Sequence, residues 1–163
     1  MKTSHPAAAA LFLLPLLWAS ATQAADSLQS RYGLLSAQPS VESKSYGVFL
    51  DGRRLAEAKA DDIRLYRVTP HGASEHIVVE AWSPSLHCQY RYFILTIEKD
   101  LSVQRSPSFG ECQRLQSASY RRNGALVVLS SNGPSPKTES FAWQGGRLTK
   151  QLPAAHVERL GAT

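Results

Sequence analysis

The sequence predicts an all-β fold, an antiparallel meander of hairpins closed by one disulfide. Short runs rich in Val, Ile, Tyr and Phe recur about every 8–12 residues, as in sandwiches and barrels. Two-residue turn signals, Asp51-Gly52 and Asn123-Gly124, stand between such runs. Helical periodicity is almost absent. These observations leave three arrangements open, namely a sandwich, a barrel and a propeller-like sheet.

The first 24 residues have the layout of a secretory signal peptide. Lys2 gives a basic start, an apolar run covers residues 7–18, and small residues follow. We expect cleavage after Ala24, with cleavage after Ala21 as the alternative. The apolar run is too short to span a bilayer, and no later run reaches that length. The sequence therefore predicts a periplasmic protein without a membrane span.

Removing 24 of the 163 residues leaves 139, enough for a single β-rich domain over residues 25–163. Loss of Lys2 lowers the net charge from +5 to +4. Because an exported protein does not routinely meet nucleic acid, we expect no such partner. The mild positive charge suits an acidic protein, an anionic polymer or a membrane surface, but it also fits an ordinary surface slightly rich in arginine.

Eight to ten strands are expected in order along the mature chain. The first hairpin turns at Asp51-Gly52, where both turn positions need positive φ. Residues 53–63 form either its second strand or a short helix, because they are rich in Ala, Glu and Lys. Further strands are expected within residues 62–69, 75–82, 88–98, 101–106, 115–122 and 125–131, and residues 138–152 are expected to form a last hairpin around residues 144–146. The tail over residues 153–163 is expected to be a loose end or one helical turn.

Cys88 and Cys112 are the two cysteines of the chain. An even number of cysteines in an oxidising compartment predicts one disulfide between them. Closing a loop of roughly 25 residues stabilises the fold by about 3.5 kcal/mol in the chain-entropy description.

No motif for catalysis, a metal or a cofactor stands out. The mature histidines, His71, His76, His87 and His156, lack the spacing of zinc ligands and are expected to be solvated. A Cys–His nucleophile would need a thiolate at Cys88, yet export favours the disulfide. No nucleophile elbow surrounds Ser106 or Ser108. Among the acids, Asp61, Glu80, Glu98 and Glu111, nothing singles out a catalytic pair. We therefore expect a binding protein rather than an enzyme.

The segment QRSPSFGECQRL, residues 104–115, is the candidate binding loop. Pro107 fixes one φ and Gly110 permits a sharp bend, so the loop is restrained. Ser106 and Ser108 offer hydroxyl groups to a partner. Phe109 offers an apolar anchor to the partner, or it folds inward as a plug over the sheet while the serines cap turns. The predicted contact residues are these five.

Several segments together resemble small periplasmic all-β proteins of proteobacteria. They are EAWSPSLHC (80–88), YRYFILTI (90–97), SFGEC (108–112), NGALVVL (123–129) and FAWQGGRL (141–148), spread over about half of the chain. Some such proteins are immunity proteins that block incoming amidase effectors of type VI secretion by inserting a Ser-bearing loop. The resemblance implies an effector hydrolase as partner and residues 106–110 as the inserted loop. The alternative is an envelope accessory module that binds cell-wall glycan, lipid or a resident protein without catalysis.

Overall fold

The computed structural model describes residues 26–40, 43–68, 72–84, 87–132 and 134–151. These residues form twelve strands and no helix, which confirms the all-β prediction. They accordingly contain no helix long and apolar enough to cross a membrane. The expected leader (residues 1–24) and the tail beyond residue 152 lie outside the described residues.

The strands form three antiparallel sheets of four, and each sheet is one consecutive stretch of chain. The first sheet contains β1 (Ser27–Ser30), β2 (Gly33–Pro39), β3 (Tyr46–Leu50) and β4 (Arg53–Ala58). The middle sheet contains β5 (Asp62–Arg67), β6 (Glu75–Trp82), β7 (Tyr90–Ile97) and β8 (Val103–Arg105). The third sheet contains β9 (Gln113–Arg121), β10 (Gly124–Ser131), β11 (Thr138–Gln144) and β12 (Arg147–Gln151).

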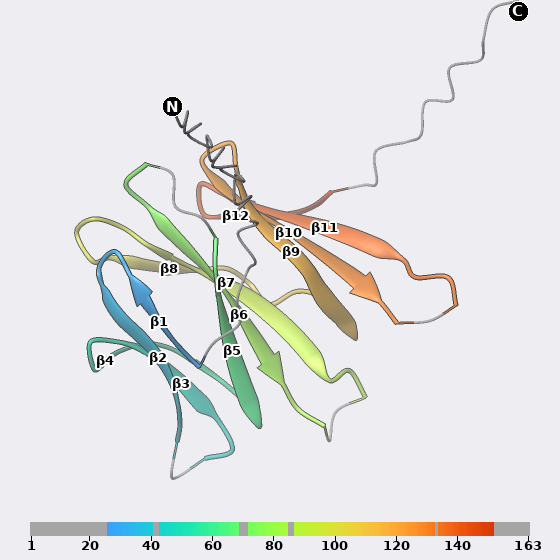
Figure 1. The fold of residues 1–163 in the computed structure, drawn as a ribbon, viewed down its shortest axis with the longest axis horizontal. Helices are drawn as coiled ribbons and strands as arrows, with labels where there is room; N and C mark the ends of the chain where they lie inside the picture. Colours follow the sequence, from blue (N-terminus) through green and yellow to red (C-terminus); the bar gives the residue numbers. More distant parts are fainter. Residues whose placement is uncertain (1–25, 41–42, 69–71, 85–86, 133, 152–163) are drawn as a thin grey trace, which may run out of the picture.

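The middle sheet packs against the first sheet on one face and the third sheet on the other (Figure 1). Successive side chains of β6 alternate between two cores: Ile77 and Val79 pack with the first sheet, and Val78 packs with the third. Strands buried on both faces need apolar residues at successive positions, which explains the apolar stretches over residues 77–79 of β6 and 93–95 of β7. The arrangement is sandwich-like and not a closed barrel.

The first predicted hairpin is confirmed. Asp51 and Gly52 join β3 to β4 with φ values of 46° and 81°. Residues 53–58 after this turn are β4, so the alternative of a short helix over residues 53–63 is wrong. The reason is tertiary: Ala56 and Leu55 join the core against the middle sheet, and Tyr46 to Leu50 supply the partner strand.

The second hairpin turns one residue earlier than predicted. Arg122 and Asn123 occupy the two turn positions with φ values of 49° and 61°, and Gly124 already begins β10. A Cβ at Gly124 would lie 2.0 Å from the carbonyl oxygen of Trp143, so only glycine allows β10 and β11 to approach this closely. Asn123 tolerates the left-handed conformation, and its Oδ1 accepts a hydrogen bond of 3.0 Å from the Tyr120 hydroxyl.

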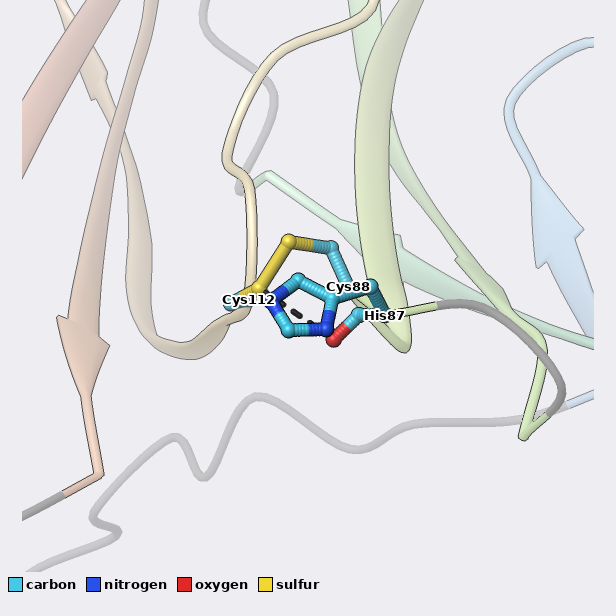
Figure 2. The surroundings of a disulfide bond; sticks show 3 residues. All are labelled: His87, Cys88 and Cys112. Atoms are coloured by element: carbon cyan, nitrogen blue, oxygen red, sulfur yellow. Dashed lines mark hydrogen bonds between the residues drawn. A yellow bond between two sulfur atoms is a disulfide. The ribbon is translucent and has the colours of Figure 1, made fainter.

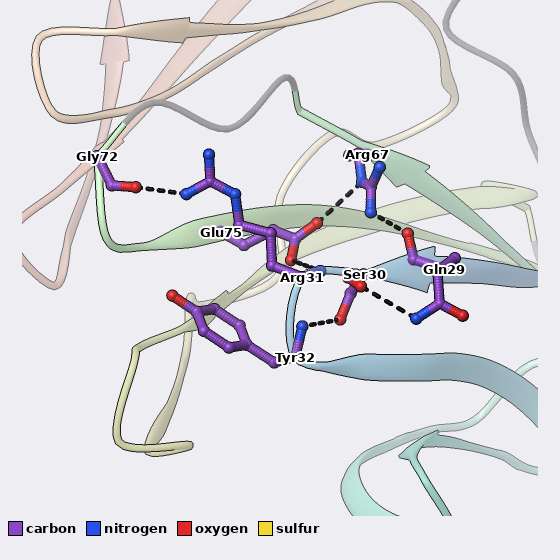
Figure 3. A network of polar contacts seen from close by, with 7 residues as sticks. All are labelled: Gln29, Ser30, Arg31, Tyr32, Arg67, Gly72 and Glu75. Carbon is purple, nitrogen blue, oxygen red and sulfur yellow. Dashed lines mark hydrogen bonds and ion pairs between the residues drawn. The ribbon is translucent and has the colours of Figure 1, made fainter.

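A polar network fastens the β1–β2 hairpin to the middle sheet (Figure 3). The fully buried Glu75 accepts from Arg67 Nε at 2.9 Å and from the backbone N–H of Arg31 at 2.8 Å. Arg67 also donates to the carbonyl of Gln29, and Arg31 donates to that of Gly72. The buried carboxylate thus has partners on both oxygens, as burial of a charge requires.

Candidate partner-binding surface

The predicted disulfide is present between Cys88 and Cys112, with Cα atoms 4.3 Å apart (Figure 2). It joins the connection between β6 and β7 to the residue directly before β9. Cys112 Sγ also lies 3.7 Å from the carbonyl oxygen of His87. The segment between β8 and β9, which is the candidate loop, is therefore covalently tied at its far end.

The candidate loop is also hydrogen-bonded along β7. The N–H of Ser106 donates to the carbonyl of Ile94 at 2.9 Å. Phe109 and Tyr92 exchange two backbone hydrogen bonds, of 2.8 and 2.9 Å. Pro107 and Ser108, both exposed, lie between these two attachments, opposite the single β7 residue Phe93. The loop is therefore a two-residue ridge held on both sides.

Three of the five predicted contact residues face inward. Ser106 is buried, and its Oγ accepts from the N–H of Ile94 and donates to the carbonyl of Pro107. Phe109 is 7% exposed, with its ring centroid 4.8 Å from that of Phe141. Gly110 has φ 75°, and a Cβ there would lie 2.2 Å from Leu129 Cδ1.

The sequence left two orientations open for Phe109, outward as an anchor for a partner or inward as a plug over the sheet, and the structure has the inward one. Its ring closes the space between the middle and third sheets, so it does not anchor a partner from outside. Pro107 and Ser108 are exposed, and the exposed Arg91 and Glu111 stand beside them. Of the contact residues predicted over residues 106–110, the two ridge residues are therefore the exposed ones, and Arg91 and Glu111 are further candidates.

Two hollows flank the ridge. The smaller, of about 250 Å³, is lined by Arg91, Ser108, Phe109 and Glu111. The larger, of about 560 Å³, is lined by Ser108, Phe109, Gly110, Glu111, Gln113, Glu139, Phe141, Leu148 and Lys150. Residues 108, 109 and 111 line both hollows, so Ser108 of the ridge borders each of them.

The larger hollow combines an apolar floor with polar groups. Gln113 is 7% exposed, and its Oε1 has no hydrogen-bond partner among the described residues. A buried acceptor without a partner is uncommon, and a donor from a bound molecule would satisfy it. At the rim, Lys150 Nζ lies 2.6 Å from Glu139 Oε1 and 5.9 Å from the ring centroid of Phe141. Both signs of charge therefore border the site.

The histidines do not assemble a metal centre within the part of the chain that the structure describes. No group of three or more His, Cys, Asp or Glu side chains lies close enough there to hold a metal ion. His76 is buried rather than solvated, with Nδ1 2.9 Å from Thr96 Oγ1, and burial lowers its pKa. His71 and His156 lie outside the described residues.

Sequence reasoning missed Arg91, Gln113 and the residues of β11 and β12 that line the larger hollow. Nothing in their local pattern distinguishes them, because the third sheet brings them beside the loop only in the folded chain. Comparison of the chain with protein families, with curated proteins and with solved structures finds no match. The resemblance to periplasmic immunity proteins stays a prediction, and the function is argued from geometry.

Proposed function

We propose that this chain is a periplasmic inhibitor that binds a secreted hydrolase, with the ridge of Pro107 and Ser108 entering a cleft of that enzyme. The observation that carries the proposal is the preformed ridge. It is fixed by backbone pairing to β7 on one side and by the Tyr92–Phe109 bridge and the disulfide on the other. A ridge that is already ordered loses little conformational entropy on binding, which favours affinity.

The chemistry of the ridge fits insertion into a polar cleft. The Ser108 hydroxyl is exposed, and it can donate and accept hydrogen bonds. Pro107 holds its own φ and exposes an apolar ring surface beside it. The Ser106 hydroxyl, by contrast, is engaged within the fold. The proposal therefore assigns the polar contact to Ser108.

The two hollows supply the rest of the interface. A stable protein–protein interface buries about 800 Å² on each partner, far more than two residues offer. Side chains of the partner would enter the larger hollow, where Phe141 and Leu148 give apolar contact and Gln113 offers its free acceptor. The charges of Arg91, Glu111 and Lys150 at the rims would fix orientation.

Two features that fit export support the proposal from a different direction. The disulfide is the kind of bond that persists in an oxidising compartment, and the apolar run over residues 7–18 has the length of the apolar region of a signal peptide. Mass spectrometry of the exported protein tests this part. The expected mass is that of residues 25–163 with the disulfide intact, and a full-length mass would contradict it.

The binding test uses the mature chain as bait for the secreted cell-wall hydrolases of the producing strain. Wild type should retain one hydrolase and suppress its action on purified cell walls. Ser108→Trp places a bulky ring on the ridge and should abolish both effects without lowering the melting temperature. The matched control is Ser119→Trp, at an exposed position of β9. Retention of the hydrolase by Ser108→Trp would overturn the proposal.

A further inference from the structure

A third hollow, of about 180 Å³, lies at the end of the middle sheet and shares no residue with the partner-binding surface. It is lined by Asp62, Arg64, Glu80, Trp82 and Tyr90. The strand register brings these side chains together: Trp82 of β6 is opposite both Asp62 of β5 and Tyr90 of β7, and Arg64 is opposite Glu80. All five therefore lie on the face of the middle sheet that turns toward the third sheet.

Glu80 is held in an unusual way for an acidic residue. It is 5% exposed, and its Oε2 accepts hydrogen bonds from Tyr92 Oη at 3.1 Å and from Tyr66 Oη at 3.3 Å. No hydrogen bond from the described residues reaches Oε1. Burial and the charge of Glu80 raise the pKa of Tyr66 to about 12, so Tyr66 stays a donor. Glu80 therefore lines the hollow as a buried carboxylate whose Oε2 is held by two tyrosine hydroxyls.

The remaining walls are aromatic and charged. Trp82 and Tyr90 are half-buried and directly opposed across β6 and β7, so apolar ring surface borders the hollow. Arg64 Nε lies 3.7 Å from Asp62 Oδ2. Arg114 of β9 lies next to this wall, with its guanidinium carbon 5.4 Å from the ring centroid of Tyr90. The hollow thus offers acceptors, a donor and a flat apolar wall.

This combination selects a neutral ligand. A free cation would meet Arg64, and a free anion would meet the carboxylates of Asp62 and Glu80, so neither charge is favoured alone. Hydroxyl groups donate to a carboxylate and accept from a guanidinium at the same time. An aromatic wall favours a flat apolar surface on the ligand. A sugar ring has both features, namely hydroxyl groups around its edge and C–H groups on its faces.

We propose that Asp62, Arg64, Glu80, Trp82 and Tyr90 form a binding site for one neutral sugar ring of a glycan. The volume admits a single ring, and the hollow opens to solvent, so the rest of a polymer can continue outside. The site follows from different residues than the partner-binding surface and stands independently of the proposed inhibition. It would hold the protein on a glycan-containing surface while the ridge stays free.

The experiment uses the fluorescence of Trp82. Residues 25–163 contain Trp82 and the buried Trp143, so a Trp143→Phe variant leaves Trp82 as the reporter. Titration with N-acetylglucosamine should give a saturable change with a dissociation constant of order 1 mM, as expected for so small a ligand. Asp62→Asn in the same background should weaken binding about tenfold. Asp100→Asn, at an exposed turn outside the hollow, is the matched control and should bind normally.

Two further probes decide the class of ligand. Tetramethylammonium and inorganic phosphate should leave the emission unchanged, and saturation by either one in place of the sugar would overturn the proposal. An equal response of Asp62→Asn and Asp100→Asn to the sugar would also overturn it, as would no response in the parent variant. Should Trp143→Phe fail to fold, saturation-transfer NMR of the sugar on the wild-type mature chain and on Trp82→Ala gives the same decision.

Discussion

Phe109 fills the space between the middle and third sheets, 4.8 Å from the ring of Phe141 and 6.1 Å from that of Tyr92. One inward ring of this size determines what the whole loop can present. Ser106 and Phe109 face inward, and the two residues between them, Pro107 and Ser108, are exposed. At the scale of single residues, the inward packing of Phe109 therefore leaves Pro107 and Ser108 as the exposed part of the loop.

Phe109→Ala should lower the free energy of unfolding by about 3–5 kcal/mol, the range for a buried phenylalanine. Ser108→Ala, on the exposed side of the same loop, should change it by less than about 0.5 kcal/mol. Urea denaturation of both oxidised variants measures the difference. A loss below about 1 kcal/mol for Phe109→Ala would show that its ring is not part of the core.

His76 gives the fold a dependence on pH. Burial lowers its pKa below the ordinary value of 6.5, although the charge of Glu98 opposes the shift. Below pH 6.5 the His76 ring of the unfolded chain binds a proton, whereas the ring in the folded chain stays neutral until the pH reaches its lower pKa. The free energy of unfolding should therefore fall as the pH drops through 6.5 toward the folded pKa, by at most about 1.4 kcal/mol per pH unit.

Denaturation of wild type and of His76→Gln at a series of pH values between about 8 and 5 isolates this contribution, because only wild type has the titrating ring. The difference in free energy between the two proteins should shrink toward acidic pH. A difference that stays constant over this range would contradict the expected shift.

At the scale of elements, the hairpin between β9 and β10 shows how two local preferences compete. Asn-Gly is a strong turn pair, but the turn is built from Arg122 and Asn123, and Gly124 is placed where β10 approaches the backbone of Trp143. Arg122 therefore accepts a left-handed conformation that costs about 1–2 kcal/mol for a residue with a Cβ.

Arg122→Gly distinguishes the two registers by the sign of its effect. In the observed register, glycine removes the left-handed strain and should leave the protein equally stable or more stable by up to about 1 kcal/mol, after the entropy of the unfolded chain is included. In the register predicted from Asn123-Gly124, the same glycine would sit in a strand and cost about 0.5–1 kcal/mol. Thermal denaturation of this variant beside wild type measures the sign.

At the scale of the whole molecule, the middle sheet joins two separate hydrophobic cores. The first core lies against the first sheet and the second against the third sheet. Polar ties cross both boundaries: Arg67 and Glu75 connect to the β1–β2 hairpin of the first sheet, and Trp143 Nε1 of the third sheet donates to Thr96 Oγ1 of β7 at 2.8 Å. The layers should therefore unfold together.

Arg67→Met should destabilise the protein more than Glu75→Gln does. Loss of Arg67 leaves a carboxylate that is 0% exposed without its countercharge, a change that costs about 3–5 kcal/mol. Glu75→Gln keeps an acceptor for Arg31 and leaves Arg67, 40% exposed, in contact with water, so we expect about 1 kcal/mol. Guanidinium denaturation measures both variants. Equal losses in the free energy of unfolding would show that the unpaired buried charge is not what destabilises Arg67→Met.

Much of the fold could be predicted from the sequence because its signals are local. The limits of β6 coincide with the predicted run over residues 75–82, and the Asp51-Gly52 turn is where its positive φ values require it. The N-terminal strands β1 and β2 were missed, since Ser27–Ser30 and Gly33–Pro39 carry only a short and interrupted apolar pattern. Their stability comes from Leu35 in the first core and from the Glu75 network.

The sequence by itself determined the strand class, most of the turns, the pairing of Cys88 with Cys112 and the restrained loop before Cys112. These follow from backbone preferences and from the presence of a single cysteine pair, which act over short stretches or need no geometry. Only the tertiary structure decided that the sheets stack in three layers, that Phe109 turns inward while Ser108 turns out, and that Glu80 meets Trp82 and Tyr90 in one hollow. Each depends on which strands become neighbours, and neighbours are chosen by burial over the whole chain rather than by any local pattern.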